Sequence, residues 1–276
     1  MSGLPALKLA PRGRFAGAGI VSAGKPAPTG LAVTDNRFQP TLLCPSIHLM
    51  SYLTLNLRRR WALRRTPAGP LRDYLGTPFP KPSADYRDLV LLAVDIETTG
   101  LDPKRDDILS LGWVSVRRNR IDLGDACHRL VRTARAISEA SAVVHRITDD
   151  QAARGERLDD VLAELLKKLA GKVMIAHCAT VEKGFLNAAC QRLYGGGLPI
   201  PVIDTQVLAR RTFERRHVAF RDSELRLHAL GERYNLPRYG AHNALSDALA
   251  AAELFLAQAA YRDRGKGVPL RDFLAW

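Results

Sequence analysis

The stretch Leu89–Gly100, LVLLAVDIETTG, decides the fold that the sequence predicts. It begins with six apolar residues in a row, which is typical of a strand buried on both faces at the centre of an α/β sheet. Side chains alternate along a strand, so Asp95 and Glu97 should point to the same side. Two neighbouring carboxylates at the end of a buried strand repel each other, and the usual remedies are a raised pKa or a bound cation. Such oxygen ligands favour magnesium or manganese.

Strands and helices are expected to alternate after this stretch, which predicts a three-layer α/β/α domain. The further expected strands are 108–117, 126–131 after a turn at Gly124, 172–176 and 201–203. The short connections make the first three strands a meander, so the second should run antiparallel to its neighbours. Expected helices are 138–145, 158–169 with Gly171 as its C-cap, 181–193, 204–211, one that ends near Tyr234, and 244–261. The last is apolar nearly all round and should be buried against the sheet.

The chain outside residues 86–265 differs in composition from the expected domain. Residues 1–49 are rich in Gly, Pro and Ala without a sustained period, so we expect either a disordered leader or an over-extended gene model before a start at Met50. Residues 50–85 are basic and Pro-rich, and are expected to form an N-terminal segment and linker. Residues 266–276 are expected to be a C-terminal tail.

Charge and composition argue against a disulfide-rich protein, a zinc protein and a membrane-spanning protein. The 276 residues include 41 Lys plus Arg and 28 Asp plus Glu, and the excess is concentrated in the first 85 residues. A cluster of five arginines within residues 58–65 surrounds Trp61, and it could bind a polymerase or another partner or be a solvated basic helix. The four cysteines form no C-x-x-C pair, which argues against a disulfide scaffold or zinc site. No apolar run approaches the roughly 20 residues of a membrane span, so a cytoplasmic location without membrane contact is expected.

Two later segments carry acids that fit beside Asp95 and Glu97. Glu182 lies three and four residues before Phe185 and Leu186, so it should share the inward helix face with them. His242 precedes Asp247, which falls on the first turn of the last expected helix and benefits from the positive end of the helix dipole. Inward-facing acids on three elements are hard to tolerate without a metal.

Together these pieces resemble a known family, the DEDD 3′–5′ exonucleases, in the DEDDh branch that includes the epsilon proofreading subunit of DNA polymerase III and RNase T. The first motif of that family, D-x-E-T-T-G, is matched in full by residues 95–100, and the third, H-x4-D, by His242 and Asp247. The second motif, A-H-N-A-x-F-D, is matched in part by residues 176–182, where Glu182 replaces the acidic Asp. Residues 145–148 (HRIT) and 204–210 resemble two intermediate landmarks.

The resemblance implies a ribonuclease H-like fold with a five-stranded mixed sheet, and hydrolysis from the 3′ ends of single-stranded nucleic acid to nucleoside 5′-monophosphates. It implies that two Mg²⁺ or Mn²⁺ ions are held by Asp95, Glu97, Glu182 and Asp247, with His242 as general base. Compared with the Asp of the motif, Glu182 has one more methylene group, which moves its carboxylate. That shift can decide whether the carboxylate touches a metal directly or through water. The implied substrate-binding residues are Thr98, Thr99, Gly100, Leu101, His145, Ile147 and His177.

Several alternatives stay open at the level of sequence. The substrate is DNA in the first interpretation and RNA or oligoribonucleotide in the second, because no motif encodes a contact to the 2′ position. A third interpretation is a nucleic-acid-binding adaptor with weakened catalysis. Asp204 is expected to cap the following helix rather than bind metal, and His177 either forms a structural hydrogen bond or contacts substrate. The arginines of residues 210–221 form either a solvated face or a strand-guiding patch.

Overall fold

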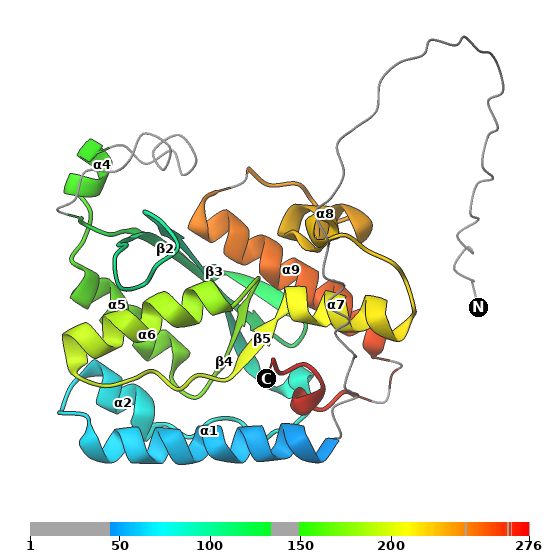
Figure 1. The fold of residues 1–276 in the computed structure, drawn as a ribbon, viewed down its shortest axis with the longest axis horizontal. Coiled ribbons are helices and arrows are strands. Elements are labelled where there is room, and N and C mark those ends of the chain that lie inside the picture. Colours follow the sequence, from blue (N-terminus) through cyan, green and yellow to red (C-terminus); the bar gives the residue numbers. More distant parts are fainter. Residues whose placement is uncertain (1–44, 134–148, 241, 264, 266, 276) are drawn as a thin grey trace, which may run out of the picture. The chain divides into compact units, whose positions relative to one another are not determined.

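The strand that carries Asp95 and Glu97 is the centre of the sheet. In the computed structural model, which describes residues 45–133, 149–240, 242–263, 265 and 267–275, the five strands are ordered β3-β2-β1-β4-β5 (Figure 1). Residues 91–94 of β1 are at most 1% exposed, as expected of a strand covered on both faces. β1 pairs antiparallel with β2 and parallel with β4, which confirms the five-stranded mixed sheet. The strands are β1 (Val90–Thr98), β2 (Ile108–Arg117), β3 (Arg120–Leu130), β4 (Val173–Ala176) and β5 (Val202–Asp204).

The hairpin between β2 and β3 lies earlier than the sequence predicted. Arg117 pairs with Arg120, and Arg118 and Asn119 between them have φ angles of 49° and 59°. Positive φ at both central residues is the geometry of a type I′ hairpin turn, whose twist matches that of the flanking strands. The expected turn at Gly124 is therefore wrong, because Gly124 lies within β3. Arg-Asn lacks the Asn-Gly or Asp-Gly signal by which such turns are recognised.

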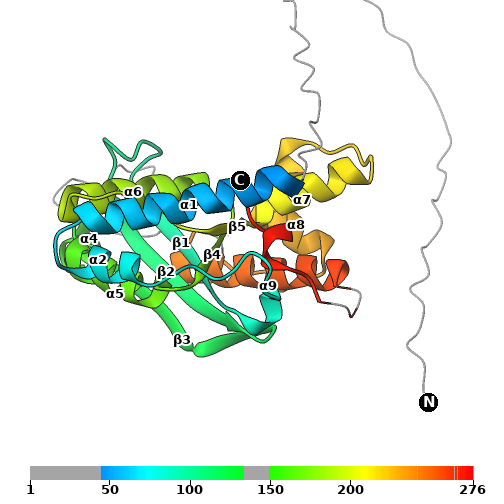
Figure 2. The ribbon, with the colours of Figure 1, turned by 90° about the horizontal axis from the view of Figure 1, so that it is seen from below.

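Helices cover both faces of the sheet. Figure 2 shows α5 and α6 on one side of the strands and α9 on the other, where α9 contacts β1, β2, β3 and β4. Because β3, β4 and β5 run in the same direction, right-handed crossovers place α5 and α6 on a common face. This is the expected three-layer arrangement, and the expected helix 138–145 lies outside the described residues. The helices of this part are α4 (Asp149–Ala153), α5 (Leu158–Leu169), α6 (Thr180–Tyr194), α7 (Thr205–Arg215), α8 (Leu227–Arg233) and α9 (Ala244–Arg262).

The segment expected to be a linker instead belongs to the core. Residues 45–76 form two helices, α1 (Pro45–Arg65) and α2 (Pro70–Gly76), and the boundary expected at residue 49 falls inside α1. Leu71, Tyr74 and Leu75 of α2 are at most 1% exposed and pack in the same hydrophobic cluster as β1. The hydroxyl of Tyr74 donates a hydrogen bond to the carbonyl of Pro199, 2.9 Å away. Pro70 marks the first turn of α2, where proline is favoured, rather than a linker.

The residues expected to be a C-terminal tail also pack against the domain. Phe273 is 1% exposed, and its ring lies 5.0 Å from that of Tyr86 and 5.4 Å from that of Phe255 on α9. The backbone N–H of Ala275 donates to the carbonyl of Val202 in β5. The domain therefore extends through these residues. No helix among those the structure describes is long and apolar enough to cross a membrane.

Candidate active site

Three of the four expected carboxylates meet at one end of β1. Asp95 and Glu97 lie on β1, and Asp247 lies in the first turn of α9. One carboxylate oxygen from each of these three residues lies within 4.8 Å of the others. Glu97 is 6% exposed and Asp247 8% exposed, so the three charges are held close together in a poorly solvated site. We call these three residues the carboxylate cluster.

Gly112 allows α9 to approach the sheet closely enough to complete the cluster. Gly112 of β2 is paired with Asp95 of β1. A Cβ atom at Gly112 would lie 2.2 Å from the backbone carbonyl carbon of Ala244 and from the backbone nitrogen of Leu245, so no side chain fits there. The first turn of α9 therefore rests on the backbone of β2, which brings Asp247 to the cluster. Sequence reasoning missed Gly112 because only the pairing of the strands reveals its position.

Burial and mutual repulsion perturb the ionisation of the cluster. Burial raises the pKa of Asp95 well above its usual range, and the charges of Glu182, Glu97 and Asp247 raise it further. Burial also raises the pKa of Asp247, although the backbone N–H of His242, 2.9 Å from Asp247 Oδ2, acts in the opposite direction. Asp247 Oδ1 is buried without a hydrogen-bond partner among the described residues. Both shifts favour the protonated, uncharged form of Asp95 and Asp247.

Glu182 does not belong to the carboxylate cluster. It is in the first turn of α6, is 3% exposed, and does not belong to the group whose oxygens lie within 4.8 Å. Its charge nevertheless acts on Asp95, and its own pKa rises to about 8, mainly because of burial and further because of Asp204 and Glu97. Glu182 Oε2 has no hydrogen-bond partner within the described part of the chain. The side chain is thus close enough to interact electrostatically with the cluster.

In EDTA, the free energy of unfolding should fall as the pH rises from about 4.5 to about 8. Glu182 has a higher pKa in the folded chain than its ordinary value of 4.5, so the folded state binds this proton more tightly and loses stability when it is released. One such group gives a slope of up to about 1.4 kcal/mol per pH unit. Urea unfolding across this pH range measures it. Glu182→Gln should flatten the slope, and an unchanged slope in that variant would contradict the assignment.

His242, the expected base, lies at the mouth of the site. It is exposed, its φ is 66°, and its charge lowers the pKa of Asp247. The left-handed backbone conformation turns the chain so that the His242 N–H donates to Asp247 just before α9 begins. Asn243 caps the helix by accepting a hydrogen bond from the Ser246 N–H. This loop places the backbone of His242 beside Asp247.

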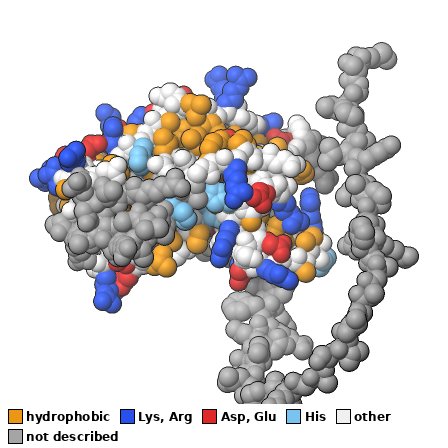
Figure 3. Space-filling view, turned by 90° about the horizontal axis from the view of Figure 1, so that it is seen from above, with side chains coloured by type: hydrophobic (Ala, Val, Ile, Leu, Met, Phe, Trp, Pro, Cys, Tyr) orange, Lys and Arg blue, Asp and Glu red, His pale blue; other side chains and the backbone are white. Residues whose placement is uncertain are grey.

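Two further histidines lie near the cluster, and sequence reasoning identified neither. His228 Nε2, on α8, lies 3.8 Å from Asp247 Oδ1. His128, on β3, is paired with Gly112; burial lowers its pKa, while the charge of Glu97 raises it. Figure 3, a view from above, shows histidine side chains near the middle of the face in view, with Lys and Arg side chains beside them. Neither residue has a motif spacing that could have singled it out.

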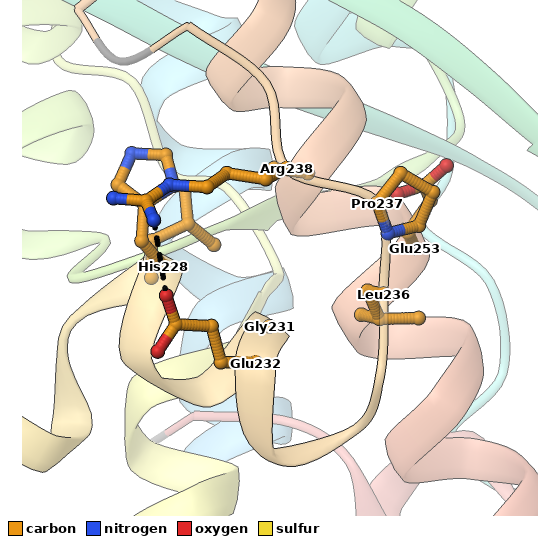
Figure 4. Close-up of a pocket in the computed structure, with 9 residues that line it drawn as sticks. His228, Gly231, Glu232, Leu236, Pro237, Arg238 and Glu253 are labelled. Atoms are coloured by element: carbon orange, nitrogen blue, oxygen red, sulfur yellow. Dashed lines mark ion pairs between the residues drawn. The ribbon is translucent and has the colours of Figure 1, made fainter.

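The pocket beside His228 is too small for a nucleotide. Figure 4 shows it between α8 and the segment that follows, with an ion pair of 3.5 Å between Arg238 and Glu232. Its volume of about 20 Å³ has room for about one water molecule.

Four of the residues expected to bind substrate lie at the end of β1 and in the turn that follows it. Thr98 is the last residue of β1, and Thr99 and Gly100 begin the turn that follows. Thr98 Oγ1 donates to the Gly100 carbonyl at 2.6 Å, and the Thr99 N–H donates to the Asp107 carbonyl. Leu101, at the tip of this turn, is 83% exposed. His145 and Ile147 lie outside the described residues.

His177 and Asp204 form a hydrogen-bonded corner at the ends of β4 and β5. His177 Nδ1 lies 2.8 Å from Thr205 Oγ1, and burial lowers the pKa of this imidazole to about 4. Asp204 accepts hydrogen bonds from the backbone N–H groups of Gln206 and Val207, which confirms it as the N-cap of α7. It also accepts from the N–H of Ala179, and so connects the start of α6 to that of α7.

The fold and the carboxylate cluster define the ribonuclease H-like class of nucleases. Residues 92–255 match the model of the exonuclease family, and the chain belongs to that family. The epsilon subunit of DNA polymerase III from Treponema pallidum is 29% identical over 186 residues, which cover 67% of this chain and 83% of that protein. The PolC-type DNA polymerase III of Thermotoga petrophila is 30% identical over 173 residues, which cover 63% of this chain but 12% of that protein.

Solved structures show the same fold. Exonuclease X in complex with 5′ overhanging duplex DNA superposes with a TM-score of 0.51 at 24% identity, covering 66% of this chain and 98% of that one. The nuclease domain of 3′hExo, a DEDDh family member bound to rAMP, gives a TM-score of 0.54 at 20% identity, covering 67% and 98%. The chain therefore shares the fold of these proteins and belongs to the exonuclease family by sequence.

Proposed function

We propose that this chain is a metal-dependent 3′–5′ exonuclease of the DEDDh type that releases nucleoside 5′-monophosphates from single-stranded DNA. The observation that carries the proposal is the buried carboxylate cluster, in which Asp95, Glu97 and Asp247 meet within 4.8 Å in a member of the exonuclease family. Oxygen ligands from carboxylates are those that Mg²⁺ and Mn²⁺ prefer.

The donor set fits a divalent cation. Asp247 Oδ1 and Glu182 Oε2 are buried without hydrogen-bond partners among the described residues, and burial and neighbouring charges raise the pKa of Asp95. A cation would compensate these charges, with Asp95, Glu97 and Asp247 as ligands and Glu182 as the fourth acid. When bound, a pair of Mg²⁺ or Mn²⁺ ions supplies Lewis-acid chemistry, which orients the attacking water and stabilises the leaving 3′ oxygen.

The residues around the cluster have distinct roles in this proposal. His242 accepts the proton of the attacking water at its imidazole, which is exposed beside Asp247. The 98–101 turn, together with His145, Ile147 and His177, positions the terminal nucleotide. Leu101, exposed at the tip of that turn, offers an apolar contact to a base.

The test uses matched DNA and RNA oligonucleotides that carry a label at either end, incubated with Mg²⁺, Mn²⁺ or EDTA. We expect a 3′ label to be released as a mononucleotide at once and a 5′ label to remain on a ladder of shortening strands. A terminal 3′ phosphate should slow release, and EDTA should abolish it.

The outcomes separate the alternatives. Faster release from RNA than from DNA would replace the DNA assignment by an RNA exonuclease. Binding of either strand without release under all metal conditions would support the adaptor interpretation. Internal cuts, or release of the 5′ label first, would contradict a 3′–5′ exonuclease.

We also propose that α1 binds an acidic protein partner, such as a polymerase subunit. Leu53, Leu57 and Trp61 are spaced four residues apart along one face and are 50%, 63% and 58% exposed. The guanidinium of Arg65 lies 3.8 Å from the centre of the Trp61 ring, and Arg64 is also exposed. Leu57→Ser with Trp61→Ser should weaken co-purification with the polymerase subunit of the same genome and leave mononucleotide release unchanged; undiminished co-purification would contradict this.

A further inference from the structure

A second cavity lies at the opposite end of α9 from the carboxylate cluster. Its volume is about 370 Å³, which is in the range of small-molecule pockets. It lies where α7, α8 and α9 end, and Figures 1 and 2 place the C-terminal ends of α7 and α9 near each other. Gln258, on its wall, is 11 residues beyond Asp247, so the two sites are separated by roughly 17 Å along the helix.

Four arginines line this cavity, which we call the arginine cavity: Arg215, Arg216, Arg233 and Arg262. None of them forms an ion pair with a carboxylate among the residues that the structure describes. Arg262 Nη1 donates to the Asp272 carbonyl and Arg215 Nε to the Arg211 carbonyl, whereas the guanidinium of Arg233 stacks 4.4 Å from the Phe213 ring. Burial and the nearby Arg215 lower the pKa of Arg262. The carboxylate of Asp272 acts on Arg262 in the opposite direction, but no ion pair among the described residues neutralises these four arginines.

Helix dipoles explain in part why arginines lie at this place. Each of the three helices ends at the cavity with its partial negative charge, and arginine is favoured in a last helical turn. The dipole effect does not require the arginines of three helices to face one cavity. Arg216 and Arg233 are exposed, so their guanidinium N–H groups are available to a ligand. A ligand with several acceptor oxygens would satisfy them.

The rest of the wall is suited to a base and a sugar. The rings of Tyr234 and Tyr261 pack edge to face with centroids 5.4 Å apart, and Tyr261 is 71% exposed. Gln258 is 8% exposed; its Nε2 donates to the Thr205 carbonyl, while its Oε1 has no hydrogen-bond partner in the described part of the chain. An exposed tyrosine offers a stacking surface to a base.

We propose that the arginine cavity binds the phosphate of a nucleotide and places the base against Tyr234 and Tyr261. The nucleotide comes either from an upstream part of a bound strand or from free mononucleotide. In both cases the arginines supply charge-assisted hydrogen bonds to phosphate oxygens. The proposal does not depend on hydrolysis at the carboxylate cluster, so it stands or falls separately from the proposed function.

The test measures binding in EDTA, where strands stay intact and the carboxylate cluster repels phosphate. The ligands are thymidine 5′-monophosphate and a 5′-labelled oligothymidylate of about twelve nucleotides. The variants are the full chain with Arg216→Gln and Arg233→Gln, and a control with Arg192→Gln, an exposed arginine on α6. Tyr261→Ala tests the contact to the base.

We expect the double variant to lose at least about tenfold in affinity for one of the two ligands, because each charge-assisted hydrogen bond is lost. For the oligonucleotide, the slope of log K against log salt should fall by about one for each phosphate contact removed. Loss with the mononucleotide indicates a free-nucleotide site, and loss with the strand alone indicates a strand path. Unchanged binding of both ligands by a folded double variant, or an equal loss in Arg192→Gln, would overturn the proposal. So would a lower melting temperature with unchanged binding, which is what the helix dipoles alone predict.

Discussion

Asp95→Asn is expected to abolish mononucleotide release and, in EDTA at pH 8, to make the protein more stable. Asp95 is the member of the carboxylate cluster whose pKa is raised by burial and by three neighbouring acids. Removing its charge removes a metal ligand, and a loss of several kcal/mol of transition-state stabilisation corresponds to about 10³-fold in rate. It also removes like-charge repulsion from a buried site, and each kcal/mol gained should raise the melting temperature by about 2–4 °C.

The two effects together distinguish a functional site from a structural one. A buried acid kept for stability would make the asparagine variant less stable. Asp122→Asn is a control, because Asp122 is a partly exposed acid on β3 that forms an ion pair of 3.4 Å with Arg117. This control should retain activity and stability within about 0.5 kcal/mol of the wild type. Activity near the wild-type level in Asp95→Asn, or a lower melting temperature in EDTA, would contradict the assignment.

Gly112→Ala is expected to lower activity by about 10² or more and the free energy of unfolding by about 1–3 kcal/mol, the usual cost of overpacking. The added methyl would lie 2.2 Å from the backbone of Ala244 and Leu245, which cannot move as a flexible side chain can. The first turn of α9 must then shift away from β2, and Asp247 moves with it. Rates measured across a metal titration, with urea unfolding of the same sample, test this.

The neighbouring strand supplies the control for this substitution. Gly124 lies on β3, and a Cβ atom there would meet Asp122 Oδ1 at 3.4 Å, an ordinary contact. Gly124→Ala should therefore leave both activity and stability close to those of the wild type. If Gly112→Ala behaves like Gly124→Ala, the close approach of α9 to β2 does not position Asp247.

Much of the fold could be predicted because its signals are local. The apolar run before Asp95 predicted the central strand, and the leucine spacing of residues 158–169 predicted α5. Part of α1 was expected only as one alternative, a solvated basic helix at residues 58–65. Its packing was not predicted, because apolar residues lie on both its buried face (Tyr52, Ala62) and its exposed face (Leu57, Trp61). The prolines of residues 67–82 indicated a linker, yet one of them begins α2.

The candidate site was predictable where acids carry a motif and unpredictable where tertiary packing decides. Asp95, Glu97 and Asp247 were expected together, and the structure brings their oxygens within 4.8 Å. Gly112 and His228 have no local signal, because strand pairing and the docking of α8 alone bring them to the site. Glu182 shows both cases. Its position on the inward face of α6 was predictable from the spacing to Phe185 and Leu186, but its absence from the carboxylate cluster was not, because tertiary packing decides it.

The most direct test of the central claim measures Mn²⁺ binding to the metal-free wild-type protein and to the metal-free Asp95→Asn variant. The electron paramagnetic resonance signal of the unbound ion reports how much Mn²⁺ each protein has taken up. The account predicts that each wild-type chain takes up two Mn²⁺ ions and that the Asp95→Asn variant, still folded, binds them at least about tenfold more weakly. Equal uptake by the two proteins, or no uptake by the wild type at millimolar Mn²⁺, would contradict a metal site at Asp95, Glu97 and Asp247.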